Sequence, residues 1–145
     1  MPASTTFENL LLQHILQNAN IANIGDATGL RGSTTTGSLY ISLHTADPNA
    51  GNQSTNEATY TGYARQALVR TSGAWTIVSN LGENATLVSF PVCTAGSNTI
   101  THFGIGVAVS GVTDLLISGT VSPNLAVGVG VTPQFAVNAL TVTVS

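Results

Sequence analysis

Alternating apolar and polar positions predict strands through most of the chain, and the stretch 38–44 shows this pattern most clearly. Its aliphatic residues, Leu39, Ile41 and Leu43, occupy every second position. Residues at this spacing share one face of a strand, so that face is predicted to be aliphatic and the opposite face mixed. Asp47-Pro48 ends the strand, because proline has no N–H to donate to a sheet.

Similar runs predict more strands after residue 62. They cover 63–70, 75–78, 85–90, 99–109, 115–121 and 140–144, with shorter apolar pieces at 125–131 and 134–137. The segment 80–84 is predicted as a turn, and 122–124, which contains Pro123, as a break. One helix followed by seven or eight short strands predicts a mostly β fold: a single-domain β-sandwich, jelly-roll-like, with one N-terminal α-helix.

One face of the predicted strand 99–109 carries small residues beside a histidine. This face consists of His102, Gly104, Gly106 and Ala108. Because the glycines have no side chain, another backbone or a large side chain can approach the sheet closely there.

The N-terminal segment predicts an amphipathic helix over 6–18. Thr5 and Glu8 stand in the spacing of a capping box. An apolar stripe then follows at helical spacing: Phe7, Leu10, Leu11 and Ile15. A helix this short needs a packing partner, which is either an open end of its own sheet or a neighbouring subunit. The long polar loops 20–37 and 45–62 are typical of contact segments. We therefore divide the chain into a helix and loop arm, 1–37, and a β-sandwich domain, 38–145.

Charge is the unusual feature of the composition. Only 6% of the 145 residues are charged, against about 25% in an average soluble protein. There is no lysine, and three arginines cannot form a phosphate-binding surface, so nucleic acid is not an expected partner. No apolar run is long enough to span a membrane and no basic signal region opens the chain, so we expect no membrane partner and synthesis in a reducing cytoplasm. The surface is then either rich in hydroxyls and amides or covered by copies of the chain or a partner.

The residues predict no catalytic, cofactor or metal site, and the protein is not expected to be an enzyme. His44, Asp47, Glu57 and His102 form the one plausible cluster, but no metal-ligand spacing joins them, so structural roles are favoured. No nucleophile elbow or dinucleotide fingerprint is present.

Several other residues have an ordinary interpretation beside a functional one. Cys93 is expected to be a small buried hydrophobe. Arg65 and Arg70 are expected at a sheet edge or over apolar neighbours, with pairing across an interface as the alternative. The sequon at Asn84 is taken as a chance match, like the one at Asn52. Aromatic residues could stack on sugars but are more often core: Tyr40, Tyr60, Tyr63 and Trp75.

A set of motifs, in this order, resembles a family of small tailed-phage structural proteins. The motifs are 39–48 (LYISLHTADP), 51–53 (GNQ), 61–65 (TGYAR), 88–91 (VSFP), 101–106 (THFGIG), 132–135 (TPQF) and 139–142 (ALTV), after an opening helix. The longer loop at 20–36 and the valine-rich piece at 125–131 depart from the family's pattern. The resemblance implies a virion component rather than an enzyme.

Such sequences are often labelled tail-fibre proteins, while similar small β-domains serve as capsid cement or decoration proteins. We favour cement, because a fibre needs repeated, elongated sequence and none is present. This interpretation implies a homotrimer on the outer capsid surface with the major capsid protein as partner. Its candidate partner contacts are Phe7, Leu10, Leu11, Ile15, Tyr60, Tyr63 and Arg65. The alternative is a tail-fibre or adhesin domain that binds host surface glycans.

Overall fold

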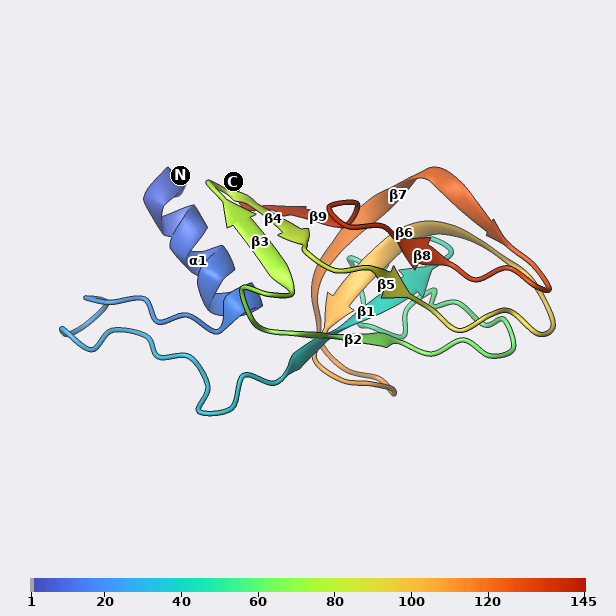
Figure 1. Ribbon diagram of the computed structural model, residues 1–145, viewed down its shortest axis with the longest axis horizontal. Helices are drawn as coiled ribbons and strands as arrows, with labels where there is room; N and C mark the ends of the chain where they lie inside the picture. Colours follow the sequence, from blue (N-terminus) through green and yellow to red (C-terminus); the bar gives the residue numbers. More distant parts are fainter. Residues whose placement is uncertain (1) are drawn as a thin grey trace. The chain divides into compact units, whose positions relative to one another are not determined.

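The computed structural model describes residues 2–145, which form one helix and nine strands (Figure 1). In chain order they are α1 (Thr5–Gln17), β1 (Ser38–His44), β2 (Gln66–Val69), β3 (Trp75–Val78), β4 (Leu81–Asn84), β5 (Val88–Ser89), β6 (Asn98–Gly106), β7 (Leu115–Val127), β8 (Gln134–Phe135) and β9 (Thr141–Thr143). The predicted fold class, mostly β with one N-terminal helix, is confirmed. The jelly-roll arrangement stays a prediction.

Internal contacts group the chain into two compact units. The helix unit contains the segment up to Ser38, Val69–Leu87 and Ala136–Ser145, and the sheet unit contains Leu39–Leu68 and Val88–Phe135. The helix and its loop therefore share a unit with two later segments. The division into 1–37 and 38–145 stays a prediction.

In the helix unit, α1 packs on the antiparallel sheet β3-β4-β9. The N-cap is Ser4, whose Oγ accepts the Phe7 N–H, so the predicted cap at Thr5 is wrong by one residue. Leu12 and Leu16 are fully buried on the helix. The absence of a side chain at Gly82 of β4 leaves space for Leu16, since a Cβ at Gly82 would lie 2.7 Å from the Leu16 Cδ1. The helix thus packs on a sheet of its own chain, which is one of the two partners expected for it, and packing on a neighbouring subunit stays a prediction.

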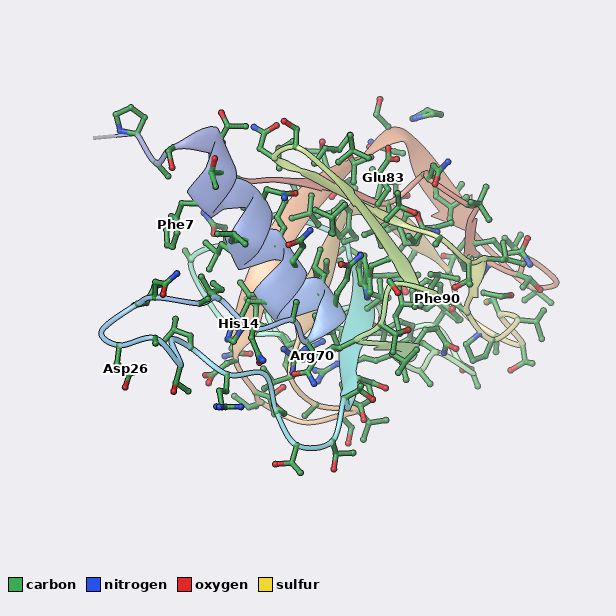
Figure 2. All side chains as sticks on the ribbon, turned by 60° about the vertical axis from the view of Figure 1, so that its left-hand side comes forward. Phe7, His14, Asp26, Arg70, Glu83 and Phe90 are labelled. Atoms are coloured by element: carbon green, nitrogen blue, oxygen red, sulfur yellow. The ribbon has the colours of Figure 1, made fainter. Side chains whose placement is uncertain are left out.

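The end of α1 is held by a network of side chains. Asn18 has a left-handed φ of 58°, and the next residue's N–H donates to the Gln13 carbonyl at 3.1 Å, which closes the helix. The Arg70 guanidinium donates to the carbonyls of His14 and Ile15, both at 2.6 Å (Figure 2). A cation is favourable there because the last helical carbonyls carry partial negative charge.

The predicted turn at 80–84 is wrong, because β4 occupies most of it. Val78 pairs with Leu81, so Ser79 and the residue after it make the whole turn. Ser79 has a φ of 58°, as a tight two-residue hairpin requires. The strand predicted over 85–90 shrinks to β5, since the buried Asn84 Nδ2 binds the Thr86 carbonyl at 2.8 Å. Because the Asn84 side chain is buried, it is not accessible for glycosylation, which agrees with taking its sequon as a chance match.

The sheet unit contains a four-stranded sheet in the order β2-β1-β6-β7 and the pair β5-β8. Aromatic rings join these two layers. The Phe135 ring of β8 lies 6.0 Å from Phe103 of β6 and 6.1 Å from Phe90, measured between ring centroids. With Ile41 and Ile105, which are fully buried, these rings form the core predicted for the aliphatic face.

β7 continues through the segment that was predicted to break it. The ladder with β6 shifts register between the pairs Ile100–Leu125 and His102–Thr120, and the Ser122–Pro123 peptide is cis. Proline is tolerated because β7 is an edge strand, where an N–H can be missing without loss of a ladder bond.

Candidate functional site

The most connected polar side chain of the sheet unit is Arg65, which lies just before β2. Its side chain is 2% exposed, and the guanidinium donates two hydrogen bonds to the Glu57 carboxylate, at 2.7 Å and 2.8 Å. These bonds raise the pKa of Arg65. The remaining N–H groups donate to Gln53, Ser54, Ala108, Gly111 and Thr113.

This arginine fastens two loops together. Gln53, Ser54 and Glu57 belong to the loop 45–62, and its other acceptors belong to the segment 108–113 between β6 and β7. Gln53 is fully buried and also donates to the Tyr40 carbonyl at 2.8 Å. The Gln53 side chain has room because the residue of β6 that it contacts, Gly106, has no side chain. A Cβ at that position would lie 2.1 Å from the Gln53 Oε1 and would clash with it. The predicted small face of β6 therefore receives a large side chain.

Tyr63 also takes part in the hydrogen-bond network around Arg65 and Glu57. Its hydroxyl donates to the Glu57 Oε1 at 2.8 Å and accepts the Leu43 N–H at 3.1 Å. Burial strongly raises the pKa of Tyr63. Every polar group here already has a partner inside the chain, so the arrangement fixes loops in place and offers no free acid or base.

The strand register brings together two of the histidines singled out in the sequence. His44 of β1 lies opposite His102 of β6, and an isolated bridge places Glu57 beside His44. Both His44 ring nitrogens are engaged, Nδ1 with the Thr55 carbonyl and Nε2 with the Ser42 hydroxyl, each at 2.8 Å.

His44 is fully buried and neutral. A carbonyl can only accept, so its Nδ1 carries the hydrogen and its Nε2 accepts from Ser42. Burial lowers the pKa of His44. No group of three metal-ligating side chains occurs among residues 2–145. The serine–histidine pair is thus a packing element under Gly104, where a Cβ would clash with both side chains.

A groove that sequence reasoning missed follows β7. It has a volume of about 410 Å³ and is lined by residues 116–120 together with Asp47, Asn49 and His102. The sequence contained one indication that this strand differs from others, since the segment 115–127 has no charged residue.

The family model described as Podophage GP4 fiber I protein gp80 matches residues 2–143. The chain belongs to this family. The phage structural resemblance seen in the sequence is therefore confirmed at the level of a fibre-type virion family. The chain has no significant match among curated proteins. No helix in the described part of the chain is long and apolar enough to cross a membrane.

For this fibre family member, the predicted contact residues of α1 lie in the helix unit with different exposure. Phe7 is 40% exposed, and the three other residues are half-buried: Leu10, Leu11 and Ile15. Figure 2 shows Phe7 on the first half of α1. Their contacts with a partner stay predictions.

The predicted contact residues of the sheet unit have internal roles. Tyr60 is 3% exposed and donates to the Pro91 carbonyl at 3.1 Å, and its ring meets Tyr63 edge to face. Burial raises the pKa of Tyr60 to about 12. Arg65 lies just before the border strand β2, at the sheet edge that was one of its predicted places, and its side chain is buried on Glu57 rather than over apolar neighbours. Trp75 is fully buried, and neither it nor Tyr60 presents a ring for sugar stacking. Cys93 is buried, as predicted.

Proposed function

We propose that the chain is a non-enzymatic structural component of a podophage fibre. The observation that carries this proposal is the family match, which extends over residues 2–143. The proposed role is assembly: the chain holds a fixed shape and contacts other virion proteins through its surface.

The polar interior supports this role. Glu57, His44 and Arg65 are the side chains best suited to chemistry, and each is engaged in hydrogen bonds inside the sheet unit. A buried bidentate ion pair with a full set of partners rigidifies its surroundings.

The surface supports assembly as well. Only six acids and three arginines are available to keep a 145-residue chain hydrated. Large aliphatic side chains are exposed in both units, including Val78, Leu87, Val112, Leu116 and Val129. Such groups gain free energy when a neighbouring protein covers them.

Immunogold labelling of intact virions tests the location. An antibody against this chain should label the fibres at the tail. Labelling confined to the head would overturn the fibre proposal.

Capsid decoration is the second candidate, and it rests on one observation. The sequence has no internal repeat of the kind that elongated fibres use. In that case label would spread over the head, with the major capsid protein as partner and three-fold clusters as the expected pattern. Glycan binding stays a prediction, and the buried Tyr60 ring does not support it.

A further inference from the structure

β7 offers a long strand edge. It spans 13 residues, Leu115–Val127, and forms one border of the sheet β2-β1-β6-β7, where it pairs only with β6. In an antiparallel ladder, every second residue of a border strand points its N–H and C=O away from the sheet. All residues of β7 except Val127 are at least partly exposed. The outer side of β7 is therefore available for pairing.

Charge and proline, two of the usual protections of such an edge, are missing from the first half of β7, where the pairing with β6 has one register shift, between Ile105 and Gly106. Soluble proteins protect border strands with charged side chains, proline or short length. β7 has no charged residue, and Pro123 lies in its second half. The other border strand, β2, has only four residues.

The groove beside β7 follows this unprotected half. It touches all five consecutive residues 116–120. His102 of β6, which pairs with Thr120, also lines the groove together with Asp47 and Asn49, so the groove lies over the face that β6 and β7 share. The unpaired outer edge of β7 beside this face suits strand addition, in which an extended segment joins a sheet through main-chain hydrogen bonds.

We propose that the segment added there is β7 of a second copy, paired antiparallel about a two-fold axis at Gly119. This register places Ser118 opposite Thr120 on one face and Ile117 opposite Val121 on the other. Hydroxyl pairs and β-branched pairs are both favourable across antiparallel strands. Pro123 falls outside this central segment, so its missing N–H does not interrupt the pairing.

The absence of charge on β7 also favours a second copy of the chain as the partner. A strand that pairs with itself brings identical side chains close together, so any charge on it is repelled by its own copy. β7 has none. The pairing goes beyond the proposed function, because it does not depend on whether the protein lies on the fibre or on the head.

Light scattering of the purified chain is the first test. The mass should approach twice 14.8 kDa and fall toward 14.8 kDa on dilution. Thr120→Lys should weaken the dimer about tenfold or more, because the two ammonium groups then lie diagonally across the strand pair on the same face and repel each other. Val129→Lys adds the same charge at a 71% exposed position outside β7 and should leave the dimer unchanged. A monomer at every soluble concentration would overturn the proposal.

Cross-linking tests the register without relying on the lysine variant. Ser118→Cys and Thr120→Cys chains, mixed and oxidised, should form a mixed disulfide dimer in higher yield than either variant alone. Hydrogen exchange of the unmodified protein should show amides of 115–121 losing protection on dilution while those of β1 keep it. A dimer that lacks the mixed disulfide and shows no such loss would place the interface elsewhere.

Discussion

Replacing Glu57 with glutamine should destabilise the sheet unit by about 3–5 kcal/mol, because it leaves the buried Arg65 without a counter-charge. The structure supports this size. Glu57 receives two charge-assisted bonds from Arg65, at 2.7 Å and 2.8 Å, and each bond to a charged group contributes about 1.5–3 kcal/mol. Water can replace these bonds only in part, since the Arg65 side chain is 2% exposed and that of Glu57 is 17% exposed. The glutamine oxygen can keep one of the two contacts, which limits the loss.

Urea unfolding followed by far-ultraviolet circular dichroism measures the effect. With a slope of about 1–3 kcal/mol per molar urea, the midpoint should fall by about 2 M. Asp47→Asn is the matched control, since it removes the same charge from an exposed side chain in the same loop and should change stability by less than about 0.5 kcal/mol. If the two variants unfolded at the same urea concentration, the buried ion pair would not be what stabilises the loops.

Three further perturbations test other parts of the structure. Gly106→Ala should cost about 1–3 kcal/mol in urea unfolding by displacing Gln53, whereas Gly128→Ala, with open space around it, should cost under about 0.5 kcal/mol; equal effects would refute the close fit. Burial lowers the pKa of His44 in the folded protein, so as the pH falls the imidazole is protonated in the unfolded chain before it is protonated in the folded one. The free energy of unfolding should therefore keep its full value above about pH 6.5, the ordinary pKa of histidine. Below that pH it should decrease by up to about 1.4 kcal/mol per pH unit. His44→Gln should remove that part of the pH dependence, and an unchanged profile would contradict it. Arg70→Gln should lower the stability of the helix unit by about 1–2 kcal/mol, read from the fluorescence of the single buried tryptophan, and an unchanged midpoint would show that the helix end does not need it.

Local patterns predicted the parts of the fold in which neighbours in sequence are neighbours in space. The alternation at 38–44 identified β1 and its buried face correctly. The small residues of 99–109 correctly indicated a close approach, and the structure shows His44 at Gly104 and Gln53 at Gly106. These predictions worked because side-chain size and period are properties of the strand itself.

Predictions failed where distant segments decide the structure. β4 forms because β3 and β9 pair with it on both sides, although 80–84 has the composition of a turn. The ion pair of Glu57 and Arg65 depends on how the loop 45–62 folds back over β6, and no spacing rule indicates this. The His44–His102 pair likewise follows from strand register, which a single sequence does not specify.

The way the helix unit is assembled from three separate segments has a consequence for its synthesis. Leu81 of β4 pairs with Thr143 of β9, so the sheet beneath α1 needs a strand that the ribosome makes long after the helix. Until residue 143 has emerged, Leu12 and Leu16 on α1 lack their complete cover. Contacts of such long sequence separation form slowly and leave apolar surface open to other molecules. The nascent chain is therefore exposed to chaperones or to premature association through its first helix until translation reaches β9.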